Sequence, residues 1–138
     1  MRQIVLNSWS KAHQTAVAQG LSCLRAGAFF DAHEHFEAAW READLPVRPL
    51  LQGLAQLAAS HHQLTLGRGR AAVRTWRKAR DKLSAVGALT PGFSAEMDAF
   101  HARAGLTSEG PRFVDPEQLG PPQGFPMLDE ETLYTPSA

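Results

Sequence analysis

Hydrophobic residues recur every three to four positions through the first hundred residues, which is the period of an amphipathic α-helix. The pattern predicts five helices, which cover residues 9–26, residues 29–43, a stretch from Pro49 to the turn at Gly67, a stretch from Ala72 to Val86, and a stretch from Pro91 to Gly105. The third stretch is apolar on most sides, as is typical of a helix at the centre of a bundle. The sequence therefore predicts an all-α fold with a central third helix.

Glycine and proline mark the ends of these stretches. Gly27, Gly67 and Gly87 follow the first, third and fourth stretches, where glycine commonly ends a helix. Thr90 and Pro91 fit the N-cap and first position of the last helix. The predicted helices are therefore joined mostly by short turns.

The two halves of the helical region resemble each other at an offset of 40 residues. The matched pairs are Gly27 with Gly67, Ala32 with Ala72, Phe36 with Trp76, and Ala39 with Ala79. Small residues let two helices approach closely while an aromatic ring fills the space between them, as in a tetratricopeptide-type hairpin. Two such units fall short of the roughly three that make a stable solenoid. We therefore expect a compact bundle of two helical hairpins followed by a short helix.

The composition changes after the helical region. Residues 105–138 hold six prolines, four glycines and six acidic residues against one arginine, with no sustained period. We therefore divide the chain into a helical domain, 1–104, and an acidic tail, 105–138. The tail contains several large apolar residues that a freely solvated linker would lack, and we expect part of it to pack on the helices. They include Phe113, Phe125, Leu128 and Tyr134.

Length and composition set further limits. At 138 residues and 43% hydrophobic content, the chain is long enough to bury a core without disulfides. Cys23 is the only cysteine, which fits a reducing compartment. No apolar run approaches the length of a membrane span, and the N-terminus lacks the order of a signal peptide. We expect a cytoplasmic protein without a membrane partner.

The densest polar cluster lies within an aromatic run, Phe29 to Arg41. His33 and Glu37 are four residues apart and share a helix face with Phe36 and Trp40. The side chains of His33 and Glu37 could therefore reach the same ion. With His61 as a third ligand and Glu34 as general base, they would form a metal-dependent hydrolase that uses zinc, iron or manganese.

The alternative needs no cofactor. A buried His33 donates to Glu37, and Arg41 or a histidine of the third helix completes the partners of the carboxylate. Gln52 and Gln56 then add amides to a polar pocket between the second and third helices. The pocket residues would be His33, Glu37, Trp40, Arg41, Gln52, Gln56 and His61. The sequence favours this interpretation: a non-catalytic binding or scaffold module for a small ligand or a protein segment, compatible with a homo-oligomer.

A basic face is the third candidate. Half of the basic residues fall between Arg68 and Lys82, and the exposed ones are expected to include Arg70, Arg74, Arg77 and Lys78. Such a face could contact phosphates. A basic helix face is often merely solvated, however, and the acidic tail offers a partner within the chain. Trp76 points to the core and gives no stacking surface, so nucleic acid is the partner that the sequence favours least.

The run Phe29 to Arg41, followed by the Leu-Gln-Gly segment at 51–53 and by His61-His62, resembles a family of small helical prokaryotic proteins. The family is domain of unknown function 309, and the resemblance covers roughly residues 15 to 86. It implies a compact all-α fold and no particular activity.

Overall fold

The structure, a computed structural model, describes residues 11–43, 47–103 and 125–128. Its helices are α1 (Lys11–Arg25), α2 (Phe29–Glu42), α3 (Arg48–Thr65), α4 (Gly69–Ala85) and α5 (Pro91–Arg103). The predicted all-α class and the five helices are confirmed, with ends shifted by a few residues. Residues 9 and 10 of the predicted first helix, and residues 104 and 105 of the predicted last helix, lie outside the described residues.

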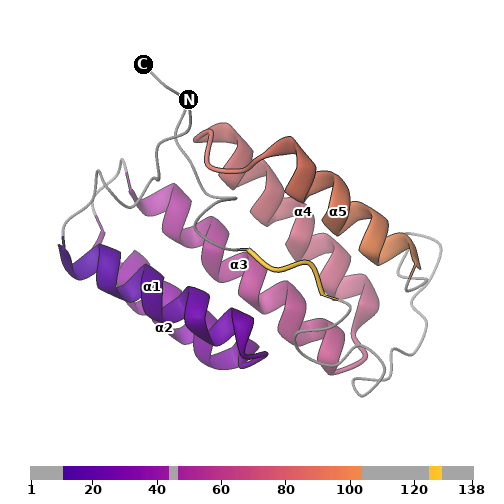
Figure 1. Cartoon of the computed structure of the whole chain (residues 1–138), viewed down its shortest axis with the longest axis horizontal. Coiled ribbons are helices and arrows are strands. Elements are labelled where there is room, and N and C mark those ends of the chain that lie inside the picture. Colours follow the sequence, from indigo (N-terminus) through magenta and orange to yellow (C-terminus); the bar gives the residue numbers. More distant parts are fainter. Residues whose placement is uncertain (1–10, 44–46, 104–124, 129–138) are drawn as a thin grey trace.

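The helices follow one another through space in sequence order. α2 packs between α1 and α3, and α3 packs between α2 and α4, with α5 beyond α4 (Figure 1). The middle position of α3 explains why it is apolar on most sides: Leu51, Leu54 and Leu57 have no exposed surface. None of the described helices is long and apolar enough to cross a membrane.

The repeat seen in the sequence extends to the turns. Gly27, Gly67 and Gly87 all have positive φ values, between 67° and 80°. In each turn the glycine amide donates to the carbonyl three residues earlier, and the next amide donates to the carbonyl five residues earlier. This pairing is the Schellman arrangement, which satisfies the last carbonyls of a helix and favours glycine at the left-handed position. The same turn therefore follows α1, α3 and α4.

The two hairpins differ where their helices cross. In the first hairpin, Gly20 lies against Phe36, and a Cβ atom at Gly20 would come within 3.0 Å of the ring. Forty residues later, Ser60 occupies the position of Gly20, and its hydroxyl donates to the carbonyl of Ala72 at 2.8 Å. A similar backbone frame thus carries a close apolar crossing in one hairpin and a hydrogen-bonded crossing in the other.

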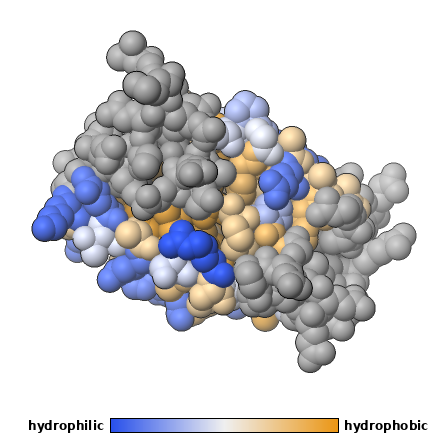
Figure 2. Space-filling view, in the orientation of Figure 1, coloured by the Kyte–Doolittle hydropathy of each residue, from blue (hydrophilic) through white to orange (hydrophobic). Residues whose placement is uncertain are grey.

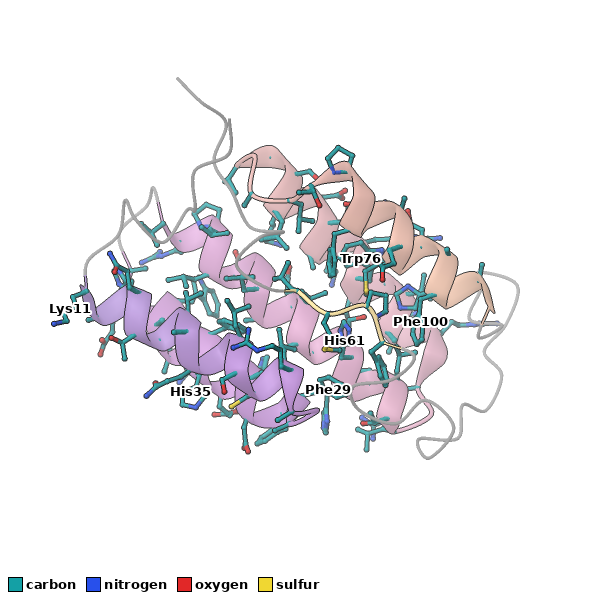
Figure 3. All side chains as sticks on the ribbon, in the orientation of Figure 1. Lys11, Phe29, His35, His61, Trp76 and Phe100 are labelled. Atoms are coloured by element: carbon teal, nitrogen blue, oxygen red, sulfur yellow. The ribbon has the colours of Figure 1, made fainter. Side chains whose placement is uncertain are left out.

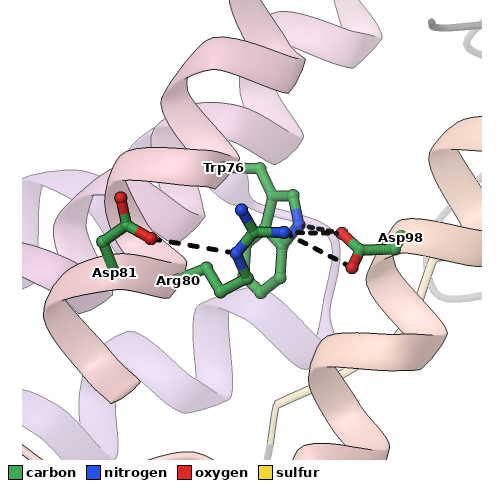
Figure 4. A network of polar contacts seen from close by, with 4 residues as sticks. All are labelled: Trp76, Arg80, Asp81 and Asp98. Carbon is green, nitrogen blue, oxygen red and sulfur yellow. Dashed lines mark hydrogen bonds and ion pairs between the residues drawn. The ribbon is translucent and has the colours of Figure 1, made fainter. Parts of the chain in front are cut away.

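α5 is held to α4 by one aromatic contact and one polar network. The rings of Trp76 and Phe93 meet edge to face at 6.2 Å. The indole N–H of Trp76 donates to Asp98 Oδ1 at 2.8 Å, and Arg80 Nη1 donates to both Asp98 oxygens at 3.4 Å (Figure 4). At the start of α5, the Thr90 hydroxyl accepts from the Phe93 amide at 3.3 Å, which is the predicted N-cap.

Four residues of the tail segment, Phe125 to Leu128, lie in an extended conformation against the helices, and in Figure 1 they cross in front of α3. Phe125 and Leu128 are buried there, while Phe113 and Tyr134 fall outside the described residues. On this face of the molecule, hydrophobic residues are visible between the grey regions, with hydrophilic residues beside them and along the left margin (Figure 2). The segment therefore adds two side chains to the core.

Candidate functional site

The polar residues of α2 form a ladder along one side of the helix. His33 Nε2 lies 2.9 Å from Glu37 Oε2, and Arg41 Nη2 lies 2.5 Å from Glu37 Oε1. Side-chain exposures of 27% for His33 and 23% for Glu37 place the ladder at the edge of the core. His33 is thus partly exposed, where the network interpretation expected a buried imidazole. Both oxygens of Glu37 already have partners.

Glu34, the candidate general base, lies at the outer end of this ladder. Its Oε1 is 3.8 Å from His33 Nδ1, and its side chain is 60% exposed. The carboxylate therefore faces solvent, where it is readily hydrated.

Two of the predicted pocket residues, Gln56 and His61, have different partners. Gln56 accepts a hydrogen bond from Lys82 Nζ at 3.1 Å and so joins α3 to α4. His61 lies beneath the tail segment, and Gln52 and Trp40 are half-buried. Within the described part of the chain, no hydrogen bond or ring contact links the ladder to Gln56 or His61. The two helices thus direct their polar groups to different surroundings.

The metal hypothesis receives no support from this arrangement. Among residues 11–43, 47–103 and 125–128, no group of three or more His, Cys, Asp or Glu side chains is placed to hold one ion. The set of His33, Glu37 and His61 with a divalent metal stays a prediction.

The structure instead brings three rings together around Phe125. Its ring centroid lies 5.0 Å from that of Phe29, 5.2 Å from that of His61 and 5.1 Å from that of Phe100. These three residues come from α2, α3 and α5, and Figure 3 shows them gathered beside the extended segment. We call the set of Phe29, His61 and Phe100 the aromatic socket. Tilted rings at these distances are a favourable arrangement beyond the area that they bury.

His61 is the polar member of the socket and is 1% exposed. Its Nδ1 lies 3.0 Å from the carbonyl oxygen of Leu57, and its Nε2 lies 3.3 Å from the carbonyl oxygen of Pro126. Burial lowers the pKa of His61, and the two carbonyls only partly offset this effect. The imidazole is therefore neutral at pH 7, and its single N–H donates to one of the two carbonyls. The Pro126 carbonyl belongs to the tail segment, so the tautomer of His61 that carries its proton on Nε2 donates to the backbone of this segment.

The residues of α2 and α3 described above fall within one family match. A family model described as Domain of unknown function (DUF309) matches residues 17–75. Residues 17–75 are therefore similar to the DUF309 family. The resemblance seen in the sequence is thus confirmed, and the function of this family is uncharacterised. Comparisons with curated proteins and with solved structures gave no match.

The DUF309 region supplies only part of the socket. It contains Phe29 and His61, together with the α2 ladder, whereas Phe100 and Phe125 lie beyond it. Residues outside the DUF309 match therefore complete the socket and fill it.

His101, also outside the DUF309 region, was not predicted as a site residue. It is 4% exposed, and neither ring nitrogen has a hydrogen-bond partner among the described residues. Burial lowers the pKa of His101 to about 4, with smaller contributions from His61 and Arg77 that lower it and from Asp98 that raises it. A signal existed in the sequence, because His101 follows Met97 by four residues and so shares its buried face.

The internal repeat also indicates the special position of His61, more clearly than its place on the apolar face of α3 does. At the offset of 40, His61 corresponds to Leu21, which is 1% exposed in the first hairpin. A histidine in place of a core leucine marks the position where the second hairpin departs from the first.

Proposed function

We propose that this chain is a non-catalytic binding module that holds an extended protein segment, anchored by an aromatic residue that proline follows, in the aromatic socket. The observation that carries the proposal is the enclosure of Phe125 by Phe29, His61 and Phe100. In this structure the occupant is the chain's own segment, and a partner segment of the same chemistry would take its place. Aromatic anchors in desolvated pockets commonly dominate such interfaces.

The contacts favour an extended peptide over a helix or a small metabolite. Phe125 and Leu128 are buried, and the backbone carbonyl of Pro126 lies within hydrogen-bond distance of His61 Nε2. Stacked helical hairpins offer extended surfaces of the kind that bind peptides. The described side chains around the socket are mainly apolar, so neither acid–base chemistry nor an ionic substrate is needed to explain it.

The expected affinity is modest. Burying one phenylalanine and one leucine contributes about 1.5 to 3 kcal/mol each, from which ordering of the segment must be subtracted. A peptide in solution should therefore bind weakly, with a Kd in the range of about 0.1 mM to 1 mM. The chain's own segment is covalently linked to the socket, so its effective concentration there is high and it occupies the socket more fully than a free peptide of the same affinity would.

A peptide of residues 122–131 tests the proposal. We expect it to bind the full chain carrying Phe125→Ala and Leu128→Ala, in which the covalently linked occupant is weakened, at least about tenfold more tightly than it binds the wild-type chain. Fluorescence anisotropy of the labelled peptide measures both affinities. A peptide with alanine in place of Phe125 should lose most of the binding.

Two neighbouring phenylalanines give a matched control. Phe29 is 3% exposed and lines the socket, whereas Phe30 is 53% exposed. Added to the double variant, Phe29→Leu should weaken peptide binding and Phe30→Leu should leave it unchanged. If the folded double variant, checked by circular dichroism, fails to bind the peptide at about 1 mM, the socket is only an internal packing site and the proposal is wrong.

A further inference from the structure

A row of exposed cations runs along α4. Of the basic residues there, Arg80 contacts Asp98 and Asp81, and Lys82 donates to Gln56. The other four are exposed, and none forms an ion pair with a carboxylate of the described residues. We call these four, Arg70, Arg74, Arg77 and Lys78, the α4 stripe.

Comparison of the two hairpins shows that packing does not require this charge. At the offset of 40, Arg74 and Arg77 of α4 correspond to Glu34 and Glu37 of α2. Both helices are the second helix of a hairpin with the same preceding turn, yet the charges of the side chains at these positions are opposite in sign. The fold accepts either sign, so the positive stripe needs a reason other than stability.

The spacing of the stripe fits a regular row of anions. Positions 70, 74, 77 and 78 fall on one helix face, and at about 1.5 Å per residue they extend over about 12 Å. Three of the four are arginines, whose planar guanidinium groups bind phosphate through two parallel hydrogen bonds. From this arrangement we propose that the α4 stripe binds the sugar–phosphate backbone of double-stranded nucleic acid without sequence preference.

Other anionic partners fit the surface less well. Unpaired strands are usually held by exposed aromatic rings, and Trp76, the aromatic residue of α4, is 1% exposed. Helices that bind a lipid surface insert apolar side chains, whereas the large exposed apolar residues of the described chain, Phe30 and Leu66, lie outside α4. The stripe thus offers charge and hydrogen bonds alone, which suits a duplex backbone.

Salt dependence provides the test. Binding of the full chain to a fluorescent duplex of about 20 base pairs should weaken steeply between about 50 and about 200 mM salt, with a slope of log K against log salt of about −3 to −4 for four phosphate contacts. Two duplexes of unrelated sequence should bind equally. The variant Arg74→Glu with Arg77→Glu, which copies the residues of α2, should weaken binding at least about tenfold and reduce the slope by about two.

A control with the same change in net charge separates the stripe from general attraction. Lys11 and Arg25 are exposed on α1, and replacing both with glutamate should leave the affinity within about twofold. The proposal is overturned if this control loses as much binding as the α4 variant. It is also overturned if the wild-type chain binds anionic vesicles or single strands more tightly than the duplex, or if it does not bind the duplex at about 50 mM salt.

Discussion

Trp76→Ala should lower the free energy of unfolding by about 3 to 5 kcal/mol, the usual cost of removing a fully buried large aromatic side chain. Trp76 is 1% exposed and fills, in the second hairpin, the place that Phe36 fills in the first. It also contacts Phe93 and donates to Asp98, so its loss should detach α5 as well as leave a cavity. Urea unfolding followed by far-ultraviolet circular dichroism measures the change.

Trp76→Phe separates the ring from the hydrogen bond. It keeps an aromatic side chain and removes the indole N–H, and the Asp98 carboxylate, which is half exposed, keeps Arg80 and solvent as partners. We expect this variant to lose about 1 to 2 kcal/mol. A loss below about 1 kcal/mol for Trp76→Ala would mean that the contact between α4 and α5 contributes little to stability.

The second large effect is loss of stability in acid, caused by His101. Its pKa falls from 6.5 in the unfolded chain to about 4 in the folded protein, so between these values the unfolded chain binds more protons. Its stabilising contribution is therefore present above pH 6.5 and is lost as the pH falls towards 4. Between pH 7 and pH 4.5 we expect His101 alone to remove about 2 kcal/mol, and the lowered pKa of His61 acts in the same direction.

Urea unfolding at both pH values, compared between wild-type and His101→Leu chains, isolates this contribution from the carboxylates that also titrate in acid. The variant should lose about 2 kcal/mol less than wild type over this range. His35→Gln changes a half-buried histidine of α2 and serves as the control, with an acid response like that of wild type. If the wild-type and His101→Leu chains lose the same free energy of unfolding over this range, protonation of His101 does not destabilise the folded protein and the prediction is wrong.

The fold was predictable because its determinants are local. Helix periods, the glycines at 27, 67 and 87, and the offset of 40 are all visible in the sequence, and the hairpins follow from them. The ladder of His33, Glu37 and Arg41 was predictable for the same reason, since residues four apart on one helix meet whatever the rest of the chain does.

The site was less predictable because it depends on contacts between distant elements. The helical period places His33 and His61 on apolar faces, but the rotation of α2 against α3 decides whether they meet, and no local pattern fixes that rotation. Phe125 stood out as an apolar residue of the tail, yet its neighbours Phe29, His61 and Phe100 come from three helices. The aromatic socket is formed by tertiary packing, which cannot be predicted from the hydrophobic period of a single helix.

The contact between His61 and Pro126 also has a consequence for the order of folding. It joins residues 65 positions apart, whereas the described helices pack mainly on their neighbours in sequence. Contacts between nearby elements form at a small entropic cost, and closing a longer loop costs more, so we expect the helices to assemble before the segment docks. Release of the segment then reverses only this last step. A competing chain could therefore enter the socket on the timescale of a local opening, without waiting for the helical body to unfold.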